Sequence, residues 1–213
     1  MKYLHTVGSL SATIQITETE KTPKLVELDK NKFICASDYF CVRKSVAQKL
    51  NLAKKLLPTG YTFKIYETYR SHEKQMKLWQ NEVKKIKTAH PNWPIEKVYE
   101  TANDGIADPN KIGSGHQTGG AVDITLCYQG KEVDMGTPYL ATDNPQTKTV
   151  CAGLTKNQWQ HRKLLSSVMS MAGLINYPLE WWHYSYGEHE WAVLTHHNKT
   201  LYRAIKQPQK TKA

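Results

Sequence analysis

A histidine and an aspartate lie seven residues apart around a glycine-rich bend, in the stretch SGHQTGGAVDITL at residues 114–126. His116 and Asp123 offer a nitrogen and an oxygen of the kind that zinc binds in proteins. The glycines between them let the backbone fold back, so that His116 can reach the side of the following segment that carries Asp123. A catalytic zinc usually has three protein ligands and one open position. The bend therefore supplies two of the three protein ligands of such a site, and a third ligand is needed.

The third candidate is His183, in the stretch EWWHY at residues 180–184. Glu180 stands three residues before it, and the tryptophans between them would exclude water. A regular strand would send Glu180 and His183 to opposite faces, so a turn or bulge must separate them if both serve one centre. Glu180 would then be the general base acting on a water that the metal activates.

Each of these residues also has a plainer interpretation. A single histidine such as His116 or His183 is more often a surface or hydrogen-bonded residue than a ligand, and EWWHY alone fits an aromatic core strand. Arg70, just past a predicted strand, is by itself an ordinary solvated arginine. Three further histidines are set aside because no general base or glycine-rich bend accompanies them: His189, His196 and His197. Spacing alone leaves the metal site and its alternatives open.

The elements that would position these residues follow from hydrophobic periodicity. Apolar residues three and four apart predict helices over residues 42–57, 71–86 and 158–173. Alternating residues predict strands at 61–69 and 121–126, residues 179–187 and 190–194 are predicted as two more strands, and 91–115 as mostly loop. This mixed order has no βαβ regularity. It predicts an α+β domain with helices packed on a largely antiparallel sheet.

Length and composition favour one domain over residues 1–213, with a flexible basic tail from about residue 204. No run of 18 apolar residues and no leader-like apolar segment is present, so we expect no membrane insertion and a cytoplasmic location, or a periplasmic or secreted one if a leader has been removed. The four cysteines show no CxxC pair and are expected to be free thiols.

The formal net charge of +10 is compatible with nucleic acid, an anionic cell surface, an acidic substrate or solubility alone. The lysines are spread over predicted helix faces and the C-terminal end, and no nucleic-acid-binding motif accompanies them. We therefore expect no nucleic-acid partner.

Two motifs carry a family resemblance. Residues 114–123 fit the pattern S-x-H-x-x-G-x-A-x-D, and residues 180–183 fit E-x-W-H some 60 residues later. In this order they resemble the D-alanyl-D-alanine dipeptidases, a branch of the zinc DD-peptidase family whose fold is similar to that of hedgehog signalling domains. The likeness extends to YETYRSHEKQ, similar to the family's D-x-Y-R-P segment, and to MGTP at residues 135–138. It covers most of residues 32–187.

The resemblance implies that one zinc ion per chain is held by His116, Asp123 and His183. Glu180 would take a proton from the attacking water and deliver it to the leaving amine. Arg70 would stabilise the oxyanion, a role worth on the order of 10²–10³ in rate. Contacts to a small D,D-dipeptide or a cell-wall peptide are expected at Ser114, Asp143 and Trp182. For Ser114, a turn hydroxyl bonded to its own backbone is the alternative.

Departures from the family pattern concern the substrate. Leu140 stands where the family's M-G-[S/T]-x-F-D segment has an aspartate thought to bind the free amino terminus of the dipeptide. A buried ammonium without an anionic partner is costly, so this change is expected to weaken strict dipeptide selection or to shift the substrate unless Asp143 compensates. Glu67 and Ser71 replace the family's aspartate and proline around the arginine.

Three functions are therefore compared. The leading hypothesis is a zinc dipeptidase that hydrolyses D-alanyl-D-alanine to two D-alanines. The nearest rival is a DD- or LD-carboxypeptidase or endopeptidase of the same superfamily that acts on peptidoglycan. The third is a zinc-binding module without catalysis, which the presence of both Glu180 and Arg70 argues against.

Overall fold

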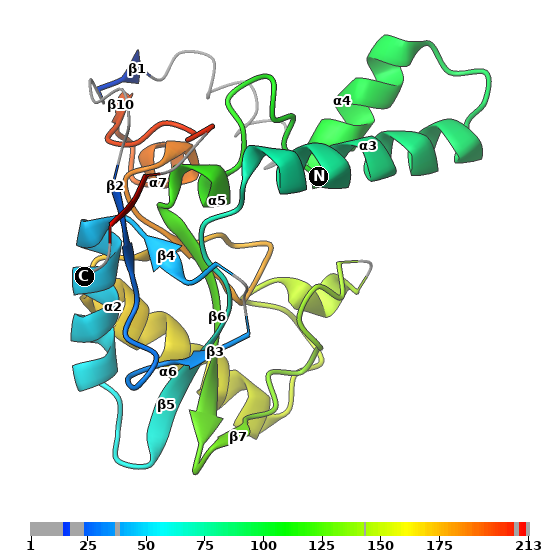
Figure 1. The fold of residues 1–213 in the computed structure, drawn as a ribbon. Helices are drawn as coiled ribbons and strands as arrows, with labels where there is room; N and C mark the ends of the chain where they lie inside the picture. The colour runs from blue at the N-terminus through cyan, green and yellow to red at the C-terminus, as the bar shows by residue number, and fades with distance from the viewer. Residues whose placement is uncertain (1–14, 18–23, 37–38, 143, 207–208, 212–213) are drawn as a thin grey trace.

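A computed structural model describes residues 15–17, 24–36, 39–142, 144–206 and 209–211 (Figure 1). Its strands are β1 (Gln15–Ile16), β2 (Lys24–Glu27), β3 (Ile34–Cys35), β4 (Cys41–Val42), β5 (Tyr61–Glu67), β6 (Ala121–Tyr128), β7 (Lys131–Glu132), β8 (Ile175–Asn176), β9 (His183–Ser185), β10 (Lys199–Thr200) and β11 (Gln209–Thr211). Its helices are α2 (Lys44–Lys55), α3 (His72–Ala89), α4 (Ile95–Gly105), α5 (Gly115–Thr118), α6 (Lys156–Met171) and α7 (His189–Leu194), with a 3-10 helix η1 (Pro145–Thr147). None of these helices is long and apolar enough to cross a membrane.

The main sheet has the strand order β3-β5-β6-β9-β8, and β7 pairs with β6 at its edge. The β3–β5 pair is parallel and the other pairs of this sheet are antiparallel. Two small sheets, β11-β2-β4 and β1-β10, flank it. The predicted α+β fold is confirmed: the main sheet is antiparallel except for the β3–β5 pair, and the two small sheets contain the parallel pairs β11–β2 and β1–β10.

Helices α2 and α6 bury their apolar faces against one side of this sheet. The predicted spacing holds in both helices, whose buried apolar residues are Val46, Leu50 and Ala53 in α2 and Leu165, Val168 and Met169 in α6. They meet the inward residues of the two central strands, Phe63, Ile65, Val122, Ile124 and Leu126, all fully buried. Because side chains alternate along a strand, Asp123 lies on the opposite face of β6.

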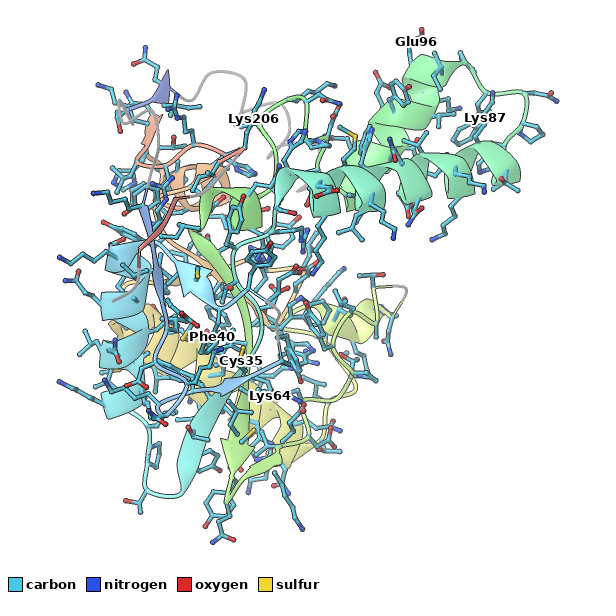
Figure 2. All side chains as sticks on the ribbon, viewed as in Figure 1. Cys35, Phe40, Lys64, Lys87, Glu96 and Lys206 are labelled. Carbon is cyan, nitrogen blue, oxygen red and sulfur yellow. The ribbon has the colours of Figure 1, made fainter. Side chains whose placement is uncertain are left out.

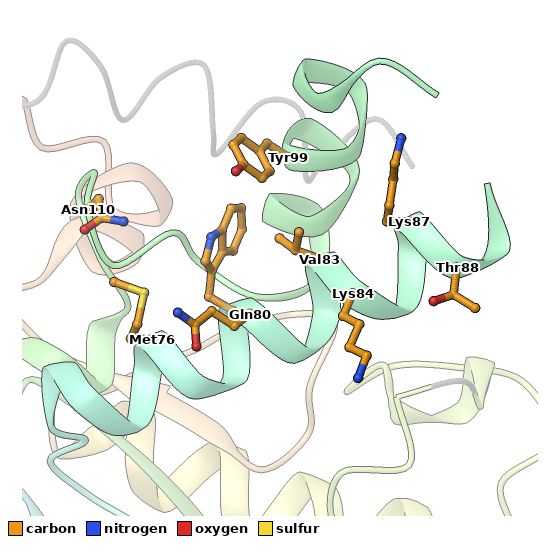
Figure 3. Close-up of a pocket in the computed structure, with 9 residues that line it drawn as sticks. Met76, Gln80, Val83, Lys84, Lys87, Thr88, Tyr99 and Asn110 are labelled. Carbon is orange, nitrogen blue, oxygen red and sulfur yellow. The ribbon is translucent and has the colours of Figure 1, made fainter. Parts of the chain in front are cut away.

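Helices α3 and α4 form an arm that extends away from the sheet (Figure 1). Lys87 and Glu96 lie near its outer end (Figure 2). Ser71 caps α3 as predicted, by accepting the N–H of Lys74. A groove of about 500 Å³ runs along the arm between the two helices, and Figure 3 shows Met76, Val83 and Tyr99 among the residues that line it. None of the predicted site residues lines this groove.

The arm corrects the prediction that residues 91–115 are mostly loop. Helix α4 begins after Pro94, whose fixed φ suits a helix start. Val98 and Ala102, four residues apart, are fully buried against Trp79 of α3. This burial stabilises a helix whose own apolar pattern is short.

Two predicted strands are also corrected. Residues 190–194 belong to α7, because the Glu188 carboxylate accepts the N–H groups of Glu190 and Trp191 at 2.9 and 2.6 Å and so caps a helix there. Of residues 179–187, only His183–Ser185 form a strand, since a turn precedes them.

The predicted flexible tail from about residue 204 is wrong where the structure describes it. Ile205 is 3% exposed. Its N–H donates to the Gln117 carbonyl at 2.8 Å, and its carbonyl accepts from the Tyr69 hydroxyl at 3.1 Å. Strand β11 pairs in parallel with β2. The polar composition of this segment therefore did not indicate that Ile205 is buried or that β11 pairs with β2.

Candidate metal centre

Three adjacent strands of the main sheet each place one polar side chain at the same level. Asp123 of β6 is paired in register with Glu67 of β5 and with His183 of β9. Directly paired residues share a face of the sheet. Glu67, Asp123 and His183 therefore lie together, on the face opposite the one that α2 and α6 cover.

The short helix α5 brings His116 to this face. Ser114 and Gln117 form a capping box at its start. Gly119 ends it with a φ of +72°, and a Cβ there would lie 2.5 Å from Leu25 Cδ2. The chain therefore reverses directly into β6, as the glycine-rich bend predicted.

His116, Asp123 and His183 present three donor atoms to one point. Nε2 of His116 and Nδ1 of His183 lie 3.2 and 2.9 Å from Oδ1 of Asp123, and the three atoms lie within 4.8 Å of one another. Donors at zinc-bonding distance in a tetrahedral site are about 3.3 Å apart. Two buried imidazoles and one carboxylate therefore fit a catalytic zinc ion, which usually has three protein ligands and a water. The described residues contain no second cluster of this kind.

Partners outside the cluster orient two of these side chains. Nδ1 of His116 lies 2.8 Å from the Thr68 carbonyl, which leaves Nε2 to face Asp123. The Tyr139 hydroxyl donates to Oδ2 of Asp123 at 2.8 Å. Burial and the Asp123 charge raise the pKa of Tyr139, so its hydroxyl stays protonated and donates. Tyr139 is itself fixed by stacking on Tyr66, with ring centroids 4.2 Å apart. Such partners are typical of ordered metal sites.

Glu180 stands beside the cluster on a turn. The His183 N–H donates to the Glu180 carbonyl, so the turn required between these residues is present. Its carboxylate Oε2 lies 4.0 Å from Nδ1 of His183, and its side chain is 30% exposed. Burial raises the pKa of Glu180 to about 7, with Asp123 and Glu190 adding to the effect and His183 opposing it. A carboxylate of this pKa suits proton transfer near neutral pH.

Sequence reasoning missed Glu190, whose Oε2 lies 3.1 Å from Nε2 of His183. Burial alone would lower the pKa of His183, but the Glu190 and Asp123 carboxylates outweigh it and hold that pKa well above its usual value. The same contact lowers the pKa of Glu190 to about 2 against the effect of burial. A sequence signal existed, since an acidic residue in the first turn is typical of a helix start and not of a strand.

Arg70 is held rigidly near the cluster. Its Nε and Nη2 donate to the two carboxylate oxygens of Glu67 at 3.0 and 2.5 Å, and its Nη1 donates to Oε1 of Gln75 at 2.8 Å. The Arg70 side chain is 11% exposed, so it is not the freely solvated arginine that its sequence position alone allowed. The backbone N–H of Arg70 donates to the carbonyl of His116, which connects the arginine to α5, the helix that carries this candidate ligand.

The predicted substrate contacts have different outcomes. Ser114 is a helix cap whose Oγ accepts the Gln117 N–H, in agreement with the turn-hydroxyl alternative. Trp182 is fully buried in the main core, edge-on to Tyr139, and its contact with substrate stays a prediction. Asp143 lies outside the described residues.

Comparison with known proteins agrees with this geometry. The sequence profile of the peptidase M15 family, described as D-Ala-D-Ala dipeptidase, matches residues 29–202. A D-alanyl-D-alanine dipeptidase of Enterococcus faecium is 30% identical over 145 residues, which cover 65% of this chain and 69% of the relative. One from Synechocystis is 36% identical over 89 residues, and this match spans 36% of each protein, little more than a third of the relative's length.

Among solved structures, VanYB in complex with D-alanine-D-alanine is similar in fold, with a TM-score of 0.50 and 18% identity. The match covers 88% of this chain and 91% of VanYB. The profile match extends over far more than half of the sequence and includes all of the candidate metal centre. The chain therefore belongs to peptidase family M15, the family of the D-Ala-D-Ala dipeptidases.

Proposed function

We propose that this protein is a zinc-dependent dipeptidase that hydrolyses D-alanyl-D-alanine to two D-alanines. The observation that carries the proposal is the buried cluster of His116, Asp123 and His183 with the Glu180 carboxylate 4.0 Å from Nδ1 of His183. Relatives named D-alanyl-D-alanine dipeptidase and the D-alanine-D-alanine complex of VanYB support the substrate class.

A zinc ion, when bound by this cluster, supplies a Lewis acid for the scissile carbonyl and lowers the pKa of a water. Glu180 accepts the proton of the attacking water and returns it to the leaving amine. Its partial exposure and its pKa of about 7 suit both transfers. Arg70 donates to the oxygen on which negative charge develops. Glu67 and Gln75 fix the guanidinium in advance, so it needs no reorganisation during the reaction.

The second candidate is a DD- or LD-carboxypeptidase or endopeptidase for longer cell-wall peptides, and Leu140 favours it. This side chain is 56% exposed and has a φ of +62°, a conformation that a leucine rarely adopts. It offers no carboxylate to the free ammonium group of a dipeptide. An acylated substrate has no such ammonium, so the missing carboxylate does not weaken its binding.

Release of D-alanine by the zinc-loaded protein tests both candidates. D-alanyl-D-alanine is compared with an acyl-D-alanyl-D-alanine peptide, and the Glu180→Ala variant serves as the blank. Cleavage of the dipeptide alone supports the dipeptidase, whereas cleavage of the longer peptide alone refutes it in favour of the carboxypeptidase.

The blank must retain its metal to be informative. Glu180 is not one of the three donors, so Glu180→Ala is expected to bind zinc while losing D-alanine release, as competition with a chromophoric chelator would show. A wild-type protein that binds zinc and cleaves neither substrate would refute both enzymes and favour the non-catalytic module.

A further inference from the structure

We infer that Glu190 is a positioning residue that orients His183 for the metal. The inference rests on the metal site of the proposed function and assigns a role to a carboxylate that no motif identified. It concerns the outer nitrogen of the imidazole, Nε2, which faces away from Asp123.

The two ring nitrogens of His183 have separate partners. Nδ1 lies 2.9 Å from Oδ1 of Asp123, on the metal side. Nε2 lies 3.1 Å from Oε2 of Glu190. Nε2 of His183 and Oε2 of Glu190 are both buried, and neither has the geometry of a hydrogen bond to any described residue, so the contact between them is an ion pair at short distance. Each therefore has the other as its close partner.

This arrangement determines which nitrogen carries the proton. A neutral imidazole that offers Nδ1 to a metal carries its proton on Nε2, and that proton needs an acceptor. A buried N–H without an acceptor costs about 1–3 kcal/mol. The Glu190 carboxylate, 3.1 Å away, is the group placed to accept that proton, and its negative charge makes Nδ1 of His183 a better electron-pair donor to a cation.

Helix α7 holds the Glu190 side chain in place. The carboxylate of Glu188 caps this helix by accepting the N–H of Glu190 itself at 2.9 Å. Oε1 of Glu190 lies 4.0 Å from Nε2 of the buried His189. The Glu190 side chain is 20% exposed. It is thus anchored at its backbone and close to an imidazole on each side.

Two carboxylates flank His183 and differ in which nitrogen they face. Glu180 is near Nδ1, on the side where the three donor atoms converge. Glu190 is near Nε2, across the ring. A metal held between Nδ1 and Asp123 is therefore out of reach of Glu190, which makes a fourth-ligand role incompatible with this geometry.

Zinc affinity tests the inference directly. Competition with a chromophoric chelator would compare the wild type with Glu190→Gln and Glu190→Ala. Loss of an outer partner typically costs 10–100-fold in metal affinity. We expect that loss for alanine and a smaller one for glutamine, which keeps an acceptor oxygen at this position.

The matched control is Glu96→Gln, which replaces another acidic residue in the first turn of a helix, here the exposed start of α4 on the arm. It removes the same charge far from the cluster and is expected to leave the zinc affinity unchanged. Circular dichroism of each metal-free variant separates a loss of fold from a loss of affinity. If Glu190→Ala destabilises the chain, Glu190→Gln still gives the test.

An unchanged zinc affinity in folded Glu190→Ala and Glu190→Gln variants would overturn the inference. So would a cobalt(II)-substituted Glu190→Gln variant whose visible spectrum reports a lost ligand, because Glu190 would then bind the metal itself. A wild type that binds zinc but releases no D-alanine would refute the proposed activity alone, and the order of zinc affinities would still decide the role of Glu190.

Discussion

Replacing Glu67 by glutamine tests how strongly the buried ion pair behind the candidate oxyanion donor stabilises the fold. The Glu67 side chain is 9% exposed and accepts hydrogen bonds from Nε and Nη2 of Arg70. Lys74 adds a third contact at 2.9 Å. Glutamine keeps the shape of the side chain and removes its charge, so it mimics protonated Glu67.

The size of the effect follows from the pKa of Glu67. Burial raises this pKa, but the hydrogen bonds from Arg70, the charge of His116 and the contact with Lys74 outweigh burial and lower it from 4.5 to about 2. Each pH unit of difference corresponds to about 1.4 kcal/mol, so ionised Glu67 stabilises the fold by about 3 kcal/mol at pH 7. Removal of one partner from a buried ion pair typically costs about 3–5 kcal/mol, which agrees.

The sign of the pH dependence is fixed because the folded pKa lies below the unfolded one. The stabilisation is fully present above pH 4.5 and is lost as the pH falls toward 2. Urea unfolding with a chelator present would measure wild type and Glu67→Gln between pH 7 and pH 2.5. The difference in free energy of unfolding should be about 3 kcal/mol at pH 7 and should shrink across that window.

A matched control is Glu132→Gln, which removes a carboxylate that is 41% exposed and pairs with Lys64. Exposed ion pairs contribute little, so its effect should be small at every pH. A Glu67→Gln difference that stays constant from pH 7 to pH 2.5 would refute the reasoning, since it would show that the charge of Glu67 is not what stabilises the fold.

Two further changes probe the cluster and its bend. Tyr139→Phe removes the hydroxyl that donates to Asp123 and keeps the ring, so chelator competition should show zinc affinity about 10–100-fold lower; an unchanged affinity would mean that this hydrogen bond does not position the aspartate. Gly119→Ala places a Cβ at a φ of +72° and against Leu25, and urea unfolding should show a loss of at least about 1–2 kcal/mol. Wild-type stability in that variant would show that the bend does not need a glycine.

The positions of some site residues could be predicted because they depend only on the local sequence pattern. The glycines after His116 imply a reversal, and alternation along β6 implies that Asp123 leaves the apolar face; the structure shows both. The spacing of Glu180 and His183 required a turn, and that turn is present. The register that pairs Asp123 with His183 could not be read from sequence, because it depends on strand pairing across 60 residues.

Helices α7 and α4 were predicted wrongly because their apolar stretches are short. EWAVL has the composition of a strand, and only the Glu188 carboxylate, bonded to two backbone N–H groups, determines a helix. Helix α4 depends in the same way on its contact with Trp79 of α3. Burial of Ile205 depends on contacts with Gln117 and Tyr69, far away in sequence. For α4 and Ile205 a tertiary contact outweighs a weak local preference, whereas for α7 a local side-chain cap does so.

Because α7 was predicted as a strand, the sequence did not indicate that three carboxylates surround His183 and differ in pKa and exposure. Asp123 is 3% exposed, and its pKa is held well below the usual range by His116 and His183 despite burial, so it remains an anion for a cation to bind. Glu190 is also held as an anion, but across the ring from Asp123. Glu180 alone combines a raised pKa with substantial exposure. Among these three carboxylates, Glu180 therefore has the properties that the proposed general base needs, partial exposure and a pKa near neutrality.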